Sequence, residues 1–238
     1  MVDDTALEAL YDYPPALSAP FVQVNFVASA DGGAELAGTS AGLSSPGDRA
    51  ILALGRDLAD VVLVGWGTAS AEGYRGIKRR ELRDRRRAAR GLSEVPPIAV
   101  VSGRCSVPAD SPLLTDTLVP PIVITCGSAP PERRRALADA GADVVVAGDD
   151  GVDPAAALAA LAERGLLRVC CEGGPVLFGA LVAADLVDQL NLTVSPVLAG
   201  GGATRIAAGT RPDAPTRLAL ESVATENGFL MLRYRRSG

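Results

Sequence analysis

The stretch Leu167–Leu181 reads LRVCCEGGPVLFGAL and is the most informative strand-turn-helix sequence of the chain. Its first five residues, Leu167–Cys171, form an apolar run that is typical of a strand buried on both faces. Gly173 and Gly174 then allow a tight turn, and Pro175 favours the first turn of a helix. A helix that begins in this way offers free N–H groups and a positive dipole end to a diphosphate. A tight turn that binds nothing explains the same glycines, so both interpretations stay open at this point.

Similar buried runs lie along the rest of the chain and alternate with helical patterns. The runs that predict strands are Val22–Ala28, Val61–Gly65, Ile98–Val101, Ile122–Thr125 and Val144–Ala147. The patterns that predict helices are Gly47–Leu58, Pro131–Ala140 and Pro154–Arg164. This alternation predicts an α/β fold with a mostly parallel sheet covered on both sides. Leu218–Glu226 and Phe229–Tyr234 flank Asn227-Gly228, a hairpin signal that predicts antiparallel strands at one edge of the sheet.

The domain organisation follows from composition. With 238 residues, 48% of them hydrophobic and 21% charged, the chain has enough apolar surface for one substantial core. Residues 21–238 are therefore predicted to form one domain. Residues 1–20 are predicted to form an extended N-terminal arm, because the paired prolines Pro14-Pro15 disfavour a helix.

Charge and residue counts exclude several classes of function. The formal net charge of -5 argues against nucleic acid or an anionic membrane as partner, because both attract basic surfaces. The sequence contains no histidine, which removes the usual general base and the usual zinc ligand. The cysteines Cys105, Cys126, Cys170 and Cys171 lack C-x-x-C spacing, so no metal site is expected. Without a leader or an apolar run of ~18 residues, the chain is predicted to be cytoplasmic.

Ligands of a parallel sheet collect at the carboxyl ends of its strands. Three predicted strands end in residues suited to a ligand: Gly65-Trp66-Gly67-Thr68, Ser102-Gly103-Arg104 and Glu172-Gly173-Gly174-Pro175. An arginine can grip a phosphate through two parallel N–H bonds, which makes Arg104 a candidate for a nucleotide phosphate. A solvated loop arginine is the alternative for the same residue.

Several segments, in a fixed order, carry a resemblance to a known family. They are Asn25–Gly32, Val62–Glu72, Glu172–Pro175, Leu186–Leu190 and Ser195–Gly201. Together they resemble the reductase domain of the riboflavin-biosynthesis deaminase-reductases. Leu10–Pro14, Pro46–Arg49 and Glu72–Tyr74 further resemble the stand-alone actinobacterial members. The zinc deaminase domain of that family needs histidine and a Pro-Cys-x-x-Cys element, so only the reduction is expected here.

The resemblance implies a three-layer fold like dihydrofolate reductase, NADPH as cofactor and a homodimer, for which Leu190–Leu198 and the terminal hairpin are expected to be exposed. By position, the implied cofactor-binding residues are Gly65, Gly67, Thr68, Glu72, Ser102, Arg104, Gly173, Gly174, Pro175, Val176, Leu177 and Phe178. Within this set Arg104 is the candidate for the 2′-phosphate that separates NADPH from NADH.

The resemblance also implies a substrate, a ribosylaminopyrimidine phosphate whose ribose is reduced, as in a 5-amino-6-(5-phosphoribosylamino)uracil reductase. The implied substrate-binding residues are Ser40, Asp48, Arg56, Arg79 and Glu172. Arg56 and Arg79 are expected to recognise the phosphate, although Arg79 lies in the charged segment Lys78–Arg90, for which a solvated helix is expected. Since histidine is absent, Glu72 is the first candidate for the proton donor, and Asp48, Glu172 or a water molecule are alternatives.

Departures from the family pattern keep two other functions open. This chain has Gly33 where most members have an arginine, and Gly42-Leu43-Ser44 where they have Trp-Ile-Thr. Asp48 occupies roughly the place where dihydrofolate reductases hold the pteridine with a carboxylate, although an acid early in a helix is favoured in any case. A dihydrofolate- or pteridine-type reductase and a non-enzymatic nucleotide-binding protein are therefore the alternatives.

Overall fold

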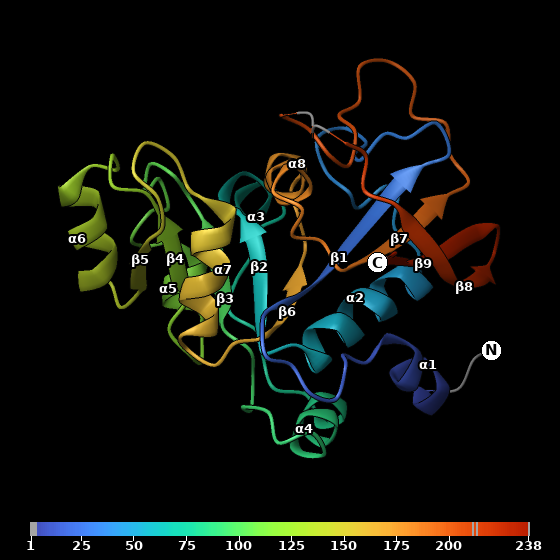
Figure 1. Ribbon diagram of the computed structural model, residues 1–238, viewed down its shortest axis with the longest axis horizontal. Helices are drawn as coiled ribbons and strands as arrows, with labels where there is room; N and C mark the ends of the chain where they lie inside the picture. Colours follow the sequence, from blue (N-terminus) through green and yellow to red (C-terminus); the bar gives the residue numbers. More distant parts are fainter. Residues whose placement is uncertain (1–3, 211, 213, 238) are drawn as a thin grey trace.

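A nine-stranded sheet runs through the computed structural model, which describes residues 4–210, 212 and 214–237 (Figure 1). Its strands are β1 (Phe21–Ser29), β2 (Val61–Gly65), β3 (Ile98–Val101), β4 (Ile122–Thr125), β5 (Asp143–Val146), β6 (Arg168–Cys171), β7 (Gln189–Ser195), β8 (Leu218–Glu226) and β9 (Phe229–Arg236). The order across the sheet is β5-β4-β3-β2-β6-β1-β7-β9-β8. The first seven strands across the sheet, from β5 at the edge to β7, pair in parallel. β9 is antiparallel to both of its neighbours, β7 and β8. The predicted parallel sheet with an antiparallel edge hairpin is confirmed.

Helices cover both faces of the sheet. They are α1 (Asp4–Tyr11), α2 (Pro46–Leu58), α3 (Trp66–Ala71), α4 (Glu81–Ala88), α5 (Pro112–Thr115), α6 (Pro131–Asp139), α7 (Pro154–Ala162) and α8 (Pro175–Ala183). One core layer packs Leu54 and Leu58 of α2 against the sheet, and the other packs Leu158 of α7 and Phe178 of α8. The molecule therefore has the predicted three layers. Among the described residues, no helix combines the length and the apolar character needed to cross a membrane.

Capping side chains fix where the helices begin. At the start of α2 the hydroxyl of Ser45 accepts a hydrogen bond from the Asp48 N–H at 3.1 Å, and Pro46 follows the cap. Asp153 caps α7 in the same way through the Ala156 N–H at 2.8 Å. Helix α8 differs, because its N-cap is Gly174, which has no side chain to accept such a bond. The first N–H groups of α8 are therefore available to a ligand.

The N-terminal segment departs from the prediction. Residues 4–11 form α1 rather than an extended arm, because the prolines that disfavour a helix come only after Tyr11. Tyr11 and Tyr13 are buried in the core beside α2, and Gln23 donates a hydrogen bond to the Tyr11 carbonyl at 3.1 Å. Burial raises the pKa of Tyr11 to about 12. Residues 1–3 of the predicted arm lie outside the described residues. The segment thus packs on the domain.

The charged segment around α4 is also not the solvated helix that its composition suggests. Arg83 and Arg86 are buried, and both bind the buried carboxylate of Asp57 in α2, at 2.6 Å and 3.0 Å. Arg86 also binds Glu8 of α1 at 2.8 Å. The charges of α4 therefore join α1, α2 and α4, which a count of charged residues cannot reveal.

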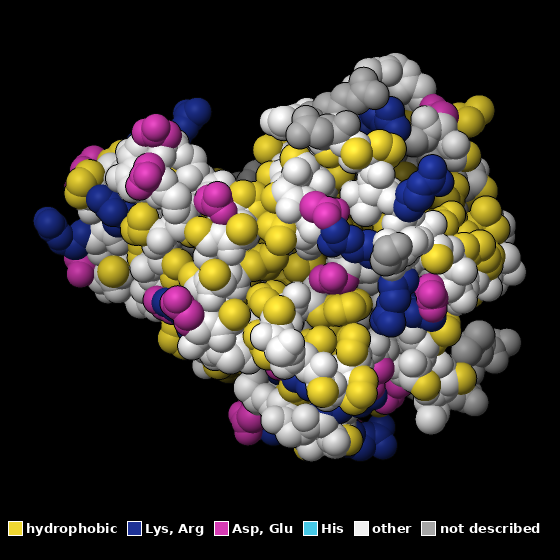
Figure 2. Space-filling model, in the orientation of Figure 1, with side chains coloured by type: hydrophobic (Ala, Val, Ile, Leu, Met, Phe, Trp, Pro, Cys, Tyr) yellow, Lys and Arg dark blue, Asp and Glu magenta, His cyan; other side chains and the backbone are white. Residues whose placement is uncertain are grey.

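The surface near β7 to β9 is only partly as expected. β7 lies between β1 and β9, so Leu190 is buried and the expectation that Leu190–Leu198 is exposed is wrong for the strand. Leu198, after the strand, is exposed. The hairpin strands expose further apolar side chains, namely Leu218, Leu220, Val223 and Leu230. In Figure 2, hydrophobic side chains gather on the surface over the part of the molecule where Figure 1 places β8 and β9.

Candidate active site

Two adjoining pockets open where the parallel strands end. The first, the polar pocket, has a volume of about 470 Å³ and lies between β1, α2, the residues after β2 and those after β6. The second, the apolar pocket, has a volume of about 730 Å³ and lies between the ends of β2 and β3 and the helices α7 and α8. The residues that line both pockets are Gly67, Thr68, Gly174, Pro175 and Val176. A ligand that fills both pockets would pass over the glycine turn.

The glycine turn after β6 is held against β2 with no room for side chains. The Gly65 N–H donates to the Gly173 carbonyl at 2.7 Å. A Cβ atom on Gly173 would lie 2.5 Å from the ring of Phe26, and one on Gly174 would overlap the hydroxyl of Thr68. The peptide bond between the two glycines is cis. Both glycines are buried rather than at the surface, so backbone atoms and not side chains form this part of the pocket wall.

The far end of the apolar pocket is positively charged. Arg104 and Arg133 are the charged side chains that line it among the described residues, and neither is joined there by a carboxylate. Ser102 is buried, and its Oγ accepts a hydrogen bond from the Ser106 N–H at 3.1 Å. Sequence reasoning found Ser102 and Arg104 but missed Arg133, because α6 follows a different strand. Its guanidinium reaches the Arg104 carbonyl at 3.4 Å.

The structure distributes the residues expected at the cofactor over four places. The pocket lining includes Gly65, Gly67, Thr68, Ser102, Arg104, Gly174, Pro175, Val176 and Leu177, all in the apolar pocket. Gly173 contributes its carbonyl to the turn, and Glu72 lines the polar pocket instead. Phe178 does not line either pocket. It is a core residue, because α8 turns its ring onto Phe26, with ring centroids 5.2 Å apart.

The polar pocket contains an arginine held by two neighbours. Arg56 donates from Nε and Nη2 to the two carboxylate oxygens of Glu172, each at 2.6 Å, and its guanidinium lies 5.2 Å from the centre of the Tyr74 ring. The Tyr74 hydroxyl donates to Glu172 Oε2 at 2.5 Å. Burial would lower the pKa of Arg56, but the Glu172 carboxylate outweighs it and raises the pKa above its usual value. Burial, reinforced by Glu172, raises the pKa of Tyr74 well above 10 and keeps its hydroxyl protonated.

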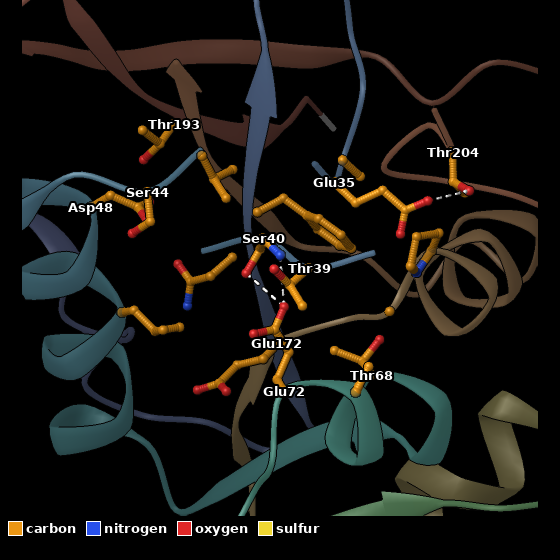
Figure 3. Close-up of a pocket in the computed structure, with 18 of the residues that line it drawn as sticks. Glu35, Thr39, Ser40, Ser44, Asp48, Thr68, Glu72, Glu172, Thr193 and Thr204 are labelled. Carbon is orange, nitrogen blue, oxygen red and sulfur yellow. Dashed lines mark hydrogen bonds between the residues drawn. The ribbon is translucent and has the colours of Figure 1, made fainter. Parts of the chain in front are cut away.

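Glu72 contacts the segment that closes one side of the polar pocket. Its Oε1 accepts hydrogen bonds from the Ser40 N–H at 2.8 Å and the Ser40 hydroxyl at 2.9 Å (Figure 3). Ser40 and Glu72, both predicted at the ligand, are thus brought together across 32 residues of sequence. Two donors on one oxygen fix the backbone at Ser40, and no further partner of Glu72 Oε2 is found among the described residues.

Asp48 and Ser44 form one end of the polar pocket, and Glu35 and Thr204 lie at the other (Figure 3). The Ser44 hydroxyl donates to Asp48 Oδ2 at 2.5 Å. The position of Asp48 in the first turn of α2 agrees with the helix-start interpretation, yet its carboxylate also lines the pocket. The helix-start interpretation of Asp48 is confirmed, and its role toward a ligand stays a prediction.

Arg79 is not brought to this pocket. It is 53% exposed and binds Asp84 at 3.2 Å and Glu94 at 3.0 Å, on the surface beside α4. Lys78 next to it is held by Asp116, so the chain after Tyr74 leads away from the pocket. The expectation that Arg79 reads a substrate phosphate is not met, and Arg56 is left as the cation of the polar pocket among the described residues.

Comparisons with known proteins agree with this architecture. Residues 20–229 match the family model of the RibD C-terminal domain. Over 184 residues, 76% of this chain and 83% of the relative, the chain is 33% identical to 2,5-diamino-6-ribosylamino-4(3H)-pyrimidinone 5′-phosphate reductase of Archaeoglobus fulgidus. A crystal structure of a pyrimidine reductase-like protein from Corynebacterium diphtheriae superposes with a TM-score of 0.85 and 26% identity, over 98% of each chain.

The fold also extends to dihydrofolate reductase. The enzyme of Enterococcus faecalis superposes with a TM-score of 0.50 and 13% identity over 92% of this chain and 97% of that chain, a likeness of fold alone. The family model covers nearly the whole sheet, both pockets and the glycine turn. Because the family model matches residues 20–229, most of the chain, this chain belongs to the RibD C-terminal domain family.

Proposed function

We propose that this chain is an NADPH-dependent reductase that acts in the cytoplasm on a ribosylaminopyrimidine phosphate of riboflavin biosynthesis. The observation that carries the proposal is the continuity of the two pockets across Gly67, Thr68, Gly174, Pro175 and Val176. One pocket suits a long nucleotide and the other a small polar molecule, so a cofactor and a substrate can meet at the shared residues. The names of relatives such as the Archaeoglobus reductase supply the substrate class.

The residues of the apolar pocket fit NADPH. The uncapped N-terminus of α8 and the backbone of the glycine turn offer N–H groups to a diphosphate, and the turn leaves no side chain to exclude it. Arg104 and Arg133 offer two cations to a 2′-phosphate at the far end. When bound, NADPH supplies the hydride. The protein contributes orientation and charge.

Arg56 is our candidate for the anchor of the substrate phosphate. Glu172 engages Nε and Nη2, and no hydrogen bond of Nη1 is found among the described residues, so one edge of the guanidinium remains for a ligand. Because Glu172 cancels much of its charge, Arg56 acts mainly as an oriented donor. Tyr74 and Glu172 hold that donor in place rather than bind the phosphate themselves.

Glu72 is our candidate for the group that moves the proton. It lines the polar pocket next to Thr68 and Ala71, close to the residues that both pockets share. Ser40 engages Oε1 alone, which leaves Oε2 for the substrate or for an ordered water. A carboxyl group in hydrogen-bond reach of the reacting group can serve as general acid or base.

The chain is further proposed to form a homodimer through the hairpin. Leu220 and Val223 of β8 are 54% and 53% exposed, and Leu230 of β9 is 41% exposed. The pairing of Leu220 with Tyr234 and of Val223 with Leu232 puts these side chains on one face of the sheet. Contiguous apolar faces of this kind are rare on monomers and are typical of interfaces.

The test is a spectrophotometric assay of purified protein with NADPH. Loss of nicotinamide absorbance is expected with the phosphorylated pyrimidine and not with dihydrofolate. Dihydrofolate is included because Asp48 also suggests a pteridine-type reductase. Turnover of dihydrofolate alone would establish the pteridine-type reductase instead. Tight NADPH binding with no turnover of either compound would establish the nucleotide-binding protein.

A further inference from the structure

We propose that Asp48 makes the polar pocket selective for the 2-amino form of the pyrimidine over its deaminated uracil form. The inference rests on the proposed function and names the substrate that the site prefers. The two candidates are 2,5-diamino-6-ribosylamino-4(3H)-pyrimidinone 5′-phosphate, after which the Archaeoglobus relative is named, and 5-amino-6-(5-phosphoribosylamino)uracil. They differ at one ring position, an amino group in the first and an oxygen in the second.

Asp48 is held so that one carboxylate oxygen stays available. Its backbone N–H is fixed by the Ser45 hydroxyl at 3.1 Å, and its Oδ2 accepts from the Ser44 hydroxyl at 2.5 Å. No hydrogen bond to Oδ1 is found among the described residues, although the side chain lines the pocket. The carboxylate is thus oriented from one side and open to a donor from the other.

The surroundings of Asp48 suit a flat, neutral heterocycle. Ile51 and Leu52 of α2 supply apolar wall, and Asn25 and Asn191 supply amides from β1 and β7. Gln189 donates to Asn191 Oδ1 at 2.9 Å, and Asn191 in turn donates to Asn25 Oδ1 at 2.9 Å, so the orientation of both amides is fixed. A phosphate is disfavoured beside Asp48, because the carboxylate repels it, whereas Arg56 still offers its Nη1 edge to a phosphate elsewhere in the pocket.

The other carboxylates of the polar pocket are engaged elsewhere. Glu172 binds Arg56 and Tyr74 with both oxygens, and Glu72, which follows α3 rather than α2, binds Ser40 through Oε1 and keeps Oε2 for the reacting group. Glu35 lies at the opposite end of the pocket from Asp48, beside Thr204 (Figure 3). Asp48 is therefore the carboxylate that can read the edge of a ring seated between α2 and the two amides.

The two pyrimidines present opposite chemistry to a carboxylate. In the diamino compound the ring N3–H and the neighbouring 2-amino group form two adjacent donors, which match Oδ1 and the second lone pair of Oδ2, the first being taken by Ser44. In the uracil compound the N3–H is flanked by carbonyl oxygens, so one of the two donors is replaced by an acceptor facing a negative charge. A site built for a donor rejects an analogue that lacks it, because its own polar group is left unpaired.

The experiment compares kcat/KM for the two pyrimidines, with saturating NADPH, in the unmodified protein and in Asp48→Asn. Loss of a charge-assisted hydrogen bond lowers kcat/KM by about tenfold or more. The kcat/KM of the unmodified protein is therefore expected to be at least about tenfold higher for the diamino compound than for the uracil compound. In Asp48→Asn the preference is expected to fall to within about threefold of unity, since an amide can donate to the uracil oxygen.

The matched control is Glu226→Gln. Glu226 also holds the start of α2, where its Oε2 accepts from the Gly47 N–H at 2.9 Å, but it does not line the polar pocket. Its substitution removes a charge at the same helix end and is expected to keep the preference. A similar loss of preference in this control would mean that helix stability, and not recognition by Asp48, sets the selectivity.

Equilibrium binding of each pyrimidine in the presence of NADP⁺ gives a second readout that needs no turnover. A preference for the diamino compound that disappears in Asp48→Asn supports the inference even if no reduction is detected, in which case only the proposed function fails. Equal binding of both compounds to the unmodified protein, or a preference that survives Asp48→Asn, overturns the role of Asp48. Turnover of the uracil compound with such a result leaves the proposed function intact.

Discussion

The salt bridge between Arg56 and Glu172 orients the guanidinium in the polar pocket, because one carboxylate holds both Nε and Nη2. It depends on α2 and the end of β6 lying side by side, across 116 residues of sequence, so the resemblance could assign both residues to the substrate pocket but could not join them. Tyr74 belongs to the segment Glu72–Tyr74 that carries the resemblance but had no role assigned to it, and Arg133 carries no sequence signal, because an arginine in an Arg-rich helix is common on surfaces. The structure alone identifies them, through the pockets they line.

Arg104→Ala is expected to weaken NADPH binding about tenfold and to leave NADH binding unchanged. One charge-assisted hydrogen bond contributes about 1.5–3 kcal/mol, and Arg133 retains part of the interaction. Fluorescence titration of both nucleotides measures the change. Arg135→Ala, on the same helix as Arg133 but outside the pocket lining, is the control and is expected to alter neither affinity. Equal affinities for NADPH and NADH in the unmodified protein would show that the two arginines do not read a 2′-phosphate.

Gly174→Val is expected to abolish NADPH binding and also to lower the free energy of unfolding by about 1–3 kcal/mol, the usual cost of forcing extra atoms into packed structure. The reason is that a Cβ atom at this position overlaps the Thr68 hydroxyl. Urea unfolding and nucleotide titration measure the two effects. Two further variants separate the loss of stability from the loss of binding. Gly174→Ala alone should be less stable, and the double variant Gly174→Ala, Thr68→Gly should regain stability, because the overlapping Thr68 side chain is removed. Full NADPH affinity in Gly174→Val would remove the glycine turn from the cofactor site.

Among the elements, the buried strands were the most predictable. Apolar runs bounded by glycine, proline or charged residues have one environment available, so β2, β3 and β4 begin and end where the sequence predicts. β7 is polar at alternate positions and escaped notice, because Asn191 and Thr193 face the polar pocket rather than a helix. α1 and α4 depend on ion pairs between distant segments, which no local pattern records.

Asp57→Ala is expected to lower the free energy of unfolding by about 3–5 kcal/mol, because it leaves Arg83 and Arg86 buried without their shared carboxylate. The matched control is Asp143→Ala, which removes the exposed partner of Arg164 and should cost at most about 1 kcal/mol. Urea unfolding followed by circular dichroism measures both. Equal small losses would mean that the network around α4 does not hold α1 and α2 together.

At the scale of the whole molecule, charge is divided between the two pockets. Among the described residues, four carboxylates line the polar pocket, namely Glu35, Asp48, Glu72 and Glu172. The described charged residues that line the apolar pocket are both arginines. The net charge of the chain, -5, could not reveal this division, because it sums over surface and site alike. The sequence likewise could not show which face of β8 and β9 is exposed, because that depends on which elements cover the other face in the folded molecule.

Leu220→Glu combined with Val223→Glu is expected to convert a dimer into a monomer, because two charges would be placed in the apolar face of β8. Analytical ultracentrifugation measures the mass in solution. Leu118→Glu, an exposed leucine away from the hairpin, is the control and should leave the dimer intact. A monomeric unmodified protein, or a dimer that survives both charges, would contradict the assignment of this face.

We propose that the two pockets bring a nicotinamide and a pyrimidine-linked ribose together at the glycine turn, and isotope transfer measures whether hydride passes between them. The purified protein is incubated with NADPH that carries deuterium at both C4 positions of the nicotinamide and with the diamino pyrimidine phosphate, and the product is analysed by mass spectrometry. We expect a ribityl product that has gained one deuterium atom on carbon. A reduced product without deuterium, or no reduced product beside bound NADPH, would show that hydride does not pass between the two pockets.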